Sequence, residues 1–249
     1  MKPKQIIPFI LLLALFANAC NNNKAPKPAE CAVQDSVIAT IHNLIILDES
    51  GSMDSVRETA LEGANETIQA IDSIYQEHPE QAQFLSFVSF SDRGSERFRV
   101  LIDNKPISEV KQLTTEDYRP DGTTPLWDAM GYALTKLEKE VAEEALVLVT
   151  IITDGYENAS RKYDGASIKT IVDRLSEKGW TFAYIGANQD AIEVAGHMGI
   201  ENAMNFKSDK EGTREMWRQE RRSRVMYYER SRRYGTAKER LKKGYFNEE

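Results

Sequence analysis

Two largely apolar runs, each leading to an aspartate, constrain the fold of this chain most strongly. The run Asn43-Leu44-Ile45-Ile46-Leu47 leads into Asp48, and the run from 145 to 152 leads, after one threonine, into Asp154. Strands that are covered on both faces are apolar at nearly every position, which is typical of central strands in a parallel sheet. Helical periodicity resumes after each run, so we predict that both aspartates lie in strand-to-helix loops.

The rest of the chain alternates between segments with strand patterns and segments with helical periodicity. The patterns predict strands at 36–47, 84–90, 97–102, 145–152, 180–186 and 203–206, and helices at 53–76, 107–113, 126–141, 168–178 and 190–198. The segment 97–102 follows a turn and is expected to pair back on 84–90 as an antiparallel edge strand. We therefore predict an α/β fold with a doubly wound, mostly parallel sheet, one antiparallel edge strand and helices on both faces.

Three loops of this predicted fold carry oxygen-bearing side chains. Asp48-Glu49-Ser50-Gly51-Ser52 places a carboxylate and two hydroxyls at alternate positions of a glycine-containing turn, and Thr124 stands where a polar loop opens a helix. Asp154 follows the second apolar strand. Strand-to-helix loops of an open parallel sheet meet where the strand order reverses, and ligands bind there. Hard oxygen donors suit Mg²⁺ or Mn²⁺, so the sequence predicts a metal site.

This D-x-S-x-S, Thr and Asp-Gly set resembles the von Willebrand factor type A (vWA) domain and its metal-ion-dependent adhesion site, over residues 37–206. The strings 151–155 and 184–190 are also similar to bacterial and phage members of that family. The resemblance implies a Rossmann-like vWA fold that binds Mg²⁺, or alternatively Mn²⁺ or Ca²⁺. It implies five ligands: Asp48, Ser50, Ser52, Thr124 and Asp154. Thr123 is an alternative to Thr124.

The chemistry of such a donor set favours binding over catalysis. Two carboxylates balance the charge of a divalent ion, while neutral hydroxyls leave it electron-poor, with one coordination position open for an anion. In adhesive members of the family, an acidic residue of the partner fills that position. We therefore expect a metal-dependent protein-binding module that is not an enzyme, whose partner offers a Glu or Asp carboxylate. The simpler alternative is that these residues only cap helices and turns.

A metal-dependent phosphohydrolase on a similar α/β fold is the alternative function. Haloacid dehalogenase-type phosphatases place a second acid two residues after the aspartate nucleophile, and here that residue is Ser50. The sequence contains neither G-x-G-x-x-G nor a Walker motif, so no nucleotide cofactor is expected. Asp128 and Glu157 lie beside the site loops in sequence and are interpreted as helix-start or loop acids, with a possible indirect influence on the ion.

The N-terminus has the pattern of an export signal. Lys2 and Lys4 precede an apolar stretch at 6–17 that leads to Cys20. We predict a signal peptide at 1–19, lipidation of Cys20 and a polar, proline-containing tether at 20–36, which would anchor the protein to a membrane of the cell envelope, on its periplasmic or surface face. Ordinary cleavage after Ala19 and secretion is the alternative.

The C-terminal residues 207–249 form a basic extension, predicted to be helical. They hold 14 Lys and Arg residues against 8 Asp and Glu, although the whole chain has a net charge of −7. One interpretation is binding to anionic lipid headgroups. The favoured one is a helix that packs its apolar residues on the domain, because their spacing is too irregular for a membrane-binding stripe; these residues are Met216, Trp217, Val225 and Tyr228. Nucleic-acid binding is not expected of an exported protein.

Overall fold

The computed structural model describes residues 39–94, 97–187, 190–233 and 244–246. Its strands are β1 (Ala39–Asp48), β2 (Gln81–Phe90), β3 (Phe98–Pro106), β4 (Leu146–Thr153), β5 (Thr181–Ala187) and β6 (Asn202–Phe206). Its α-helices are α1 (Arg57–Glu77), α2 (Leu126–Glu138), α3 (Gly165–Glu177), α4 (Ala191–His197) and α5 (Lys210–Arg233). Two short 3₁₀ helices, η1 (Gly51–Val56) and η2 (Ile107–Glu109), complete the elements.

The strands form one sheet in the order β3-β2-β1-β4-β5-β6. All neighbouring pairs are parallel except β2 and β3, which are antiparallel. The chain proceeds outward from β1 through β2 to β3, then returns to the centre at β4 and proceeds the other way. The strand order thus reverses between β1 and β4, as expected for a doubly wound sheet. The predicted fold class, including the antiparallel edge strand, is confirmed.

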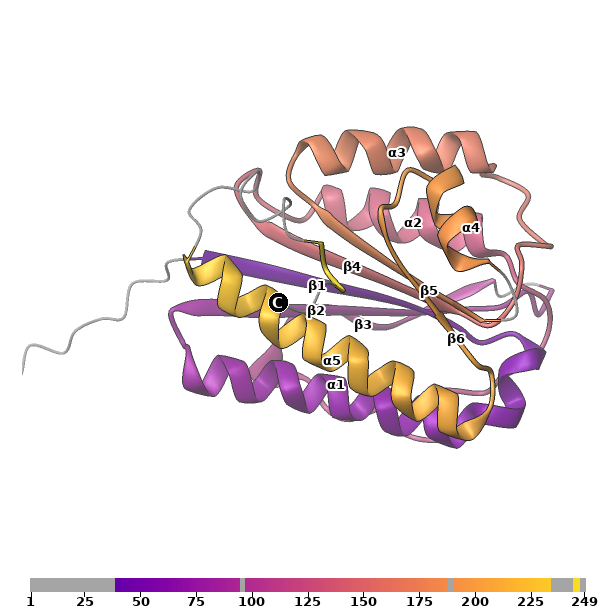
Figure 1. The fold of residues 1–249 in the computed structure, drawn as a ribbon, viewed down its shortest axis with the longest axis horizontal. Coiled ribbons are helices and arrows are strands. Elements are labelled where there is room, and N and C mark those ends of the chain that lie inside the picture. Colours follow the sequence, from indigo (N-terminus) through magenta and orange to yellow (C-terminus); the bar gives the residue numbers. More distant parts are fainter. Residues whose placement is uncertain (1–38, 95–96, 188–189, 234–243, 247–249) are drawn as a thin grey trace, which may run out of the picture. The chain divides into compact units, whose positions relative to one another are not determined.

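Helices cover both faces of the sheet (Figure 1). On one face, Ile41 and Ile45 of β1 pack in the same hydrophobic cluster as α1 and α5. On the other face, Leu44 and Ile46 belong to the cluster that contains residues of α2, α3 and α4. Because successive side chains of a strand point to opposite faces, the run 44–47 can be apolar at every position only if both faces are covered. This arrangement explains the uninterrupted apolar run before Asp48.

Some predicted boundaries differ from the observed ones. The helix expected at 107–113 is only the single turn η2, because Asn65 of α1 hydrogen-bonds both backbone groups of Leu113, donating to its carbonyl at 2.9 Å and accepting from its N–H at 2.7 Å. Helix α3 begins at Gly165 instead of 168, and its N-cap Asp164 accepts from the N–H of Ser167. The helix expected to start at Met53 is preceded by the 3₁₀ turn η1.

Helix α5 belongs to the same compact unit as the sheet. Met216, Trp217 and Tyr228 are buried as expected, but the prediction for Val225 is wrong, because its side chain is 40% exposed. The inner position is taken instead by Arg224, which is fully buried. It donates to Glu220 of the same helix, to Asn43 Oδ1 of β1 at 2.8 Å and to Thr150 Oγ1 of β4 at 2.9 Å. A polar cluster therefore holds α5 on the centre of the sheet.

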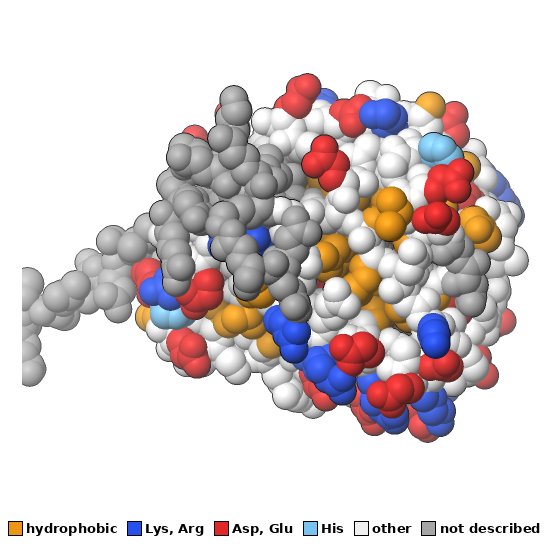
Figure 2. All heavy atoms as spheres, in the orientation of Figure 1, with side chains coloured by type: hydrophobic (Ala, Val, Ile, Leu, Met, Phe, Trp, Pro, Cys, Tyr) orange, Lys and Arg blue, Asp and Glu red, His pale blue; other side chains and the backbone are white. Residues whose placement is uncertain are grey.

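The outward side of α5 carries charges of both signs. Figure 2 shows Lys and Arg side chains interleaved with Asp and Glu along the lower edge of the molecule. Arg218 pairs with Glu215, and Arg221 pairs with Glu66 of α1 at 2.7 Å. Among the described residues, none of the helices has an apolar stretch that could cross a bilayer. The predicted signal peptide, Cys20 and the predicted tether lie outside the described residues, as do positions 234–243 and 247–249 of the extension.

Candidate metal centre

The loop after β1 is fixed to the loop before α2 by backbone hydrogen bonds. The N–H of Gly51 donates to the carbonyl of Gly122 at 3.1 Å, and the N–H of Asp121 donates to the carbonyl of Glu49 at 2.9 Å. Gly122 has a positive φ of 77°, and a Cβ there would lie 2.3 Å from the carbonyl oxygen of Asp92. Only glycine fits this backbone position, which brings the Thr124 loop against the Asp48 loop.

Asp48 lies deepest in the site and is fully buried. Its Oδ1 accepts from the N–H of Ser50 at 2.7 Å, and its Oδ2 accepts from the hydroxyl of Thr153 at 2.6 Å. Burial raises the pKa of Asp48 to about 6, partly opposed by these two hydrogen bonds and increased by the nearby charge of Asp154. The structure thus orients two neighbouring carboxylates in a buried place, which is costly without a compensating positive charge.

The two serines connect the first loop to Asp154. Ser50 Oγ lies 3.1 Å from Ser52 Oγ, and Ser52 Oγ donates to Asp154 Oδ1 at 2.6 Å, although 102 positions separate the last two residues. Adjacent oxygens around an octahedral Mg²⁺, with bonds of 2.0–2.1 Å, are about 2.9 Å apart. The two observed separations are those of ordinary hydrogen bonds and lie on either side of that value, so the three oxygens are close enough together to bind one ion.

Thr124 is buried beside the same two loops. A Cβ added to Gly155 would lie 3.7 Å from Thr124 Oγ1, which places this hydroxyl next to the residue that follows Asp154. Thr123, the alternative, is exposed, and its carbonyl accepts from the N–H of Asp92 at 3.0 Å. The structure therefore brings Asp48, Ser50, Ser52, Thr124 and Asp154 together at the carboxyl ends of β1 and β4.

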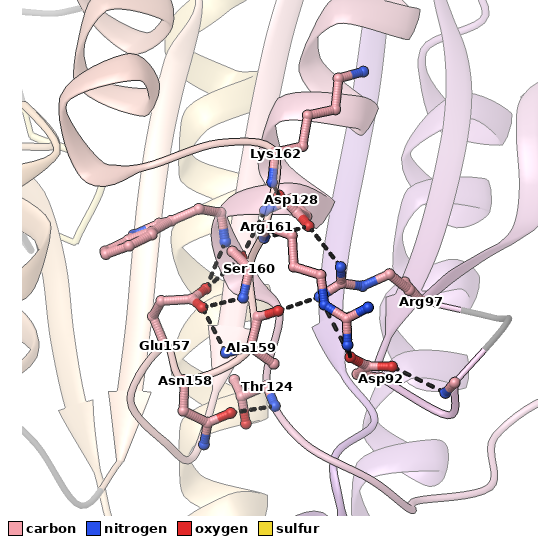
Figure 3. A network of polar contacts seen from close by, with 12 residues as sticks. Asp92, Arg97, Thr124, Asp128, Glu157, Asn158, Ala159, Ser160, Arg161 and Lys162 are labelled. Carbon is pink, nitrogen blue, oxygen red and sulfur yellow. Dashed lines mark hydrogen bonds and ion pairs between the residues drawn. The ribbon is translucent and has the colours of Figure 1, made fainter.

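The loop after β4 supports Thr124 through a network of polar contacts (Figure 3). Asn158 Oδ1 accepts from the N–H of Thr124 at 2.8 Å, and the N–H of Asn158 donates back to the carbonyl of Thr124 at 3.1 Å. Glu157 accepts from the N–H of Ser160 at 2.6 Å and from its hydroxyl at 2.7 Å. Asp128 accepts from the backbone of residues 161–163 and pairs with Arg97.

These contacts define the roles of the two acids beside the site. Glu157 and Asp128 fold the loop at 157–163 around Thr124, in agreement with their interpretation as loop and helix-start acids. The neighbouring acid of the first loop, Glu49, is also directed away from the cluster. It is buried and paired with Arg93 at 2.9 Å and with Arg99 at 2.5 Å. Although burial pushes the pKa of Glu49 up, hydrogen bonds from the arginines and the backbone bring it below its usual value.

Three supporting residues were not identified from the sequence. Thr153 and Ser208 donate to the two aspartates, the latter to Asp154 Oδ2 at 3.0 Å, and the buried Tyr118 donates to the carbonyl of Asp48 at 2.6 Å. Thr153 is the one polar residue between an apolar run and an aspartate, and this contrast could have identified it as a residue that supports the site. Ser208 and Tyr118 lie in polar segments far from the motif in sequence, which gave no such indication.

In the described parts of the chain, no group of three or more His, Cys, Asp and Glu side chains is placed to hold a metal ion. A candidate centre in these regions therefore depends on hydroxyl oxygens as well as carboxylates. The hydroxyl of Ser50 contacts Ser52, and His42 hydrogen-bonds Asn104 at 2.8 Å, on the edge-strand side of the sheet. This oxygen-only set suits a hard divalent cation.

Residues 44–217 match the family model of the von Willebrand factor type A domain. The match covers more than half of the chain, so the chain belongs to this family. Domains of this family are typically interaction modules, not enzymes, and commonly bind a divalent metal. A search of curated proteins found no match.

Solved structures show the same fold at low sequence identity. The pilus adhesin SpaC from Lactobacillus rhamnosus GG matches with a TM-score of 0.57 and 10% identity, over 74% of this chain and 30% of that chain. Proximal thread matrix protein 1 from the mussel byssus matches with a TM-score of 0.54 and 16% identity, over 74% and 45%. A mutant of the PilB minor pilin from Streptococcus sanguinis matches with a TM-score of 0.50 and 12% identity, over 74% and 61%. The chain thus spans less than two thirds of each of these proteins.

Proposed function

We propose that this vWA domain binds a protein partner through a divalent cation held by Asp48, Ser50, Ser52, Thr124 and Asp154. The observation that carries the proposal is the contact chain from Ser50 through Ser52 to Asp154, with separations of 3.1 and 2.6 Å. It joins residues from two loops with the oxygen spacing of an octahedral ion. Ordinary capping would not require a serine of one loop to reach an aspartate 102 positions away.

The residues of the proposed site are of two kinds, charged carboxylates and neutral hydroxyls. Asp48 and Asp154 supply the negative charge that a divalent cation balances, while the hydroxyls of Ser50, Ser52 and Thr124 donate lone pairs without adding charge. The bound ion, with Mg²⁺ as the first choice and Mn²⁺ or Ca²⁺ as alternatives, would attract a further anion. Ser52 is exposed, so the centre faces solvent on that side. A Glu or Asp carboxylate of the partner is the anion we assign.

Metal binding is tested by titrating the full chain with Mn²⁺ in a calorimeter. We expect one site in the wild-type protein, and loss of that site in Asp48→Ala and Asp154→Ala. Asp164→Asn is the matched control, because Asp164 caps α3 away from the centre and asparagine is an equally good N-cap. Equal Mn²⁺ affinity in the control and the two alanine variants would reject the proposed ligands.

Partner binding is tested by affinity capture from membrane extracts, with Mg²⁺ and with EDTA. We expect a partner that is retained in Mg²⁺ and released both by EDTA and by Asp48→Ala. Capture that is unchanged in both conditions would refute a metal-mediated contact. Hydrolysis of p-nitrophenyl phosphate that requires Asp48 would instead favour the phosphohydrolase alternative, although no contact of Ser50 gives it the role of the second acid.

We further propose that the protein is held in the cell envelope by a lipid on Cys20. The N-terminal pattern supports this placement, and the pilin and pilus adhesin among the structural neighbours are surface proteins by their names. Residues 20–36 would then tether the domain to the membrane. Mass spectrometry of the protein from the membrane fraction tests the anchor. An acylated Cys20 is expected, and a mature chain that is secreted with an unmodified Cys20 would contradict it.

A further inference from the structure

A pocket of about 410 Å³ opens beside the metal centre. Its lining includes Leu126 and Trp127, just after Thr124, and Tyr156 and Glu157, just after Asp154. The remaining wall comes from the first residue of α3 and from α4 with its two flanking residues. Two residues along a chain span at most about 7 Å, so the pocket begins within that distance of two of the proposed ligands. A partner that reaches the ion therefore also reaches this pocket.

The walls of the pocket are aromatic and aliphatic. The indole of Trp127 lies against Gly165, where an added Cβ would be 3.5 Å from the ring. Val194 of α4 contributes a further apolar side chain. Tyr156, which also lines the pocket, is 58% exposed. A concave site with an aromatic and aliphatic lining is typical of a binding pocket.

The rim of the pocket is acidic. Glu157, Asp190 and Glu193 all line it, and among the described lining residues His197 is the one with a basic side chain. The cations of the neighbouring loop are directed elsewhere, since Arg161 pairs with Asp92 and Lys162 lies over the ring of Tyr163. The pocket therefore combines apolar walls with a negative rim that these neighbouring cations do not neutralise.

We propose that this pocket binds an arginine or lysine side chain of the same partner whose carboxylate reaches the metal ion. The aliphatic part of a long basic side chain fits against Trp127 and Tyr156, and its charge meets the acidic rim. The proposal rests on the proposed function and adds to it a second recognition element. At about 3.3 Å per residue in an extended segment, a span of about 7 Å corresponds to about two positions, so spacings of one to four positions between the acid and the basic residue are tested.

The first measurement uses isolated side chains. N-acetyl-arginine amide and N-acetyl-citrulline amide are titrated into the ¹⁵N-labelled full chain in EDTA, and the indole N–H resonance of Trp127 is followed. Citrulline has the shape of arginine without its charge. We expect a saturable shift with the arginine compound and none with the citrulline compound. No response to arginine up to 20 mM, or an equal response to both compounds, overturns the proposal.

The second measurement uses labelled Gly/Ser peptides in Mg²⁺, each with one Asp and either Arg or citrulline one to four positions away. Two or three partly exposed ion pairs and an aromatic contact predict a preference for arginine of about tenfold at the best spacing. The double variant Asp190→Asn/Glu193→Gln should remove most of this preference, and asparagine preserves the N-cap of α4. Glu201→Gln, an exposed acid outside this pocket, is the control. Equal binding of citrulline peptides, or a preference that survives the double variant, overturns the proposal.

The two proposals can fail separately. If the peptides bind equally in Mg²⁺ and in EDTA, the metal-mediated contact is wrong, while the comparison of arginine with citrulline still decides the role of the pocket. If no peptide binds, the titration with the single amino acid amides decides it. Loss of all peptide binding in EDTA, with no difference between arginine and citrulline, supports the metal centre and rejects the pocket.

Discussion

Replacing Arg224 by methionine should strongly destabilise the domain. Its guanidinium is fully buried and donates to Glu220 at 2.5 and 2.9 Å, to Asn43 at 2.8 Å and to Thr150 at 2.9 Å. Methionine fills a similar volume but donates no hydrogen bond. Glu220, also fully buried, would then lose its cationic partner and retain a hydrogen bond from the hydroxyl of Tyr245 at 3.1 Å.

The expected cost follows from the charge that is left behind. Removing one member of a buried ion pair typically costs about 3–5 kcal/mol, because the other charge remains out of water without compensation. Domains of this size are stable by about 5–15 kcal/mol, so the change would remove a large part of the total. Replacing both residues, as in Glu220→Leu/Arg224→Met, removes the unpaired charge and should recover most of the loss.

Urea unfolding, followed by far-UV circular dichroism and tryptophan fluorescence, measures these free energies. Arg218→Met is the matched control, because Arg218 lies on the exposed side of the same helix and its ion pair with Glu215 should contribute less than about 1 kcal/mol. A cost below about 1 kcal/mol for Arg224→Met would refute the reasoning. So would a double variant that is less stable than the single one.

Two further changes test the packing of the helices and the metal centre. Gly63→Ala would place a Cβ 2.2 Å from the indole of Trp217, so the free energy of unfolding should fall by about 1–3 kcal/mol. Gly196→Ala is the control, because a Cβ there would meet nothing within 4 Å, and it should be neutral or slightly stabilising. Equal effects of the two changes in urea unfolding would contradict the close contact between α1 and α5. Mg²⁺ at 100 times its dissociation constant should stabilise the wild-type chain by about 2.7 kcal/mol and leave Asp154→Ala unchanged in thermal unfolding, and an equal gain in both would place the ion elsewhere.

The sheet was predictable because its strongest patterns lie in the most central strands. β1 and β4 are apolar on both faces, and such runs are hard to accommodate elsewhere than in the middle of a covered parallel sheet. The same two strands deliver Asp48 and Asp154, so predicting their position also predicted that these aspartates would lie close together. Ser50 and Ser52 followed from their spacing on the turn after β1.

The features that were missed depend on partners far away in the sequence. A buried arginine looks like a surface residue in a helical pattern. The inner position of Arg224 depends on Glu220 of the same helix and on Asn43 and Thr150, which lie on two different strands. Because Arg224 occupies the inner face of α5, Val225 is partly exposed instead of buried. The sequence around Ser208 does not indicate its contact with Asp154. Ser208 follows β6, and only the order of strands in the sheet brings it to the residue that follows β4. Local periodicity does not contain this information.

The central claim is that five side chains from three loops hold one divalent cation. A crystal of the protein soaked in Mn²⁺ tests it most directly, because anomalous scattering locates manganese independently of the refined protein atoms. We predict a single strong peak among Asp48, Ser50, Ser52, Thr124 and Asp154, within about 2.0–2.3 Å of at least one serine hydroxyl, and its disappearance in Asp154→Ala. A map without a peak there, or a peak that persists in the variant, would contradict the account.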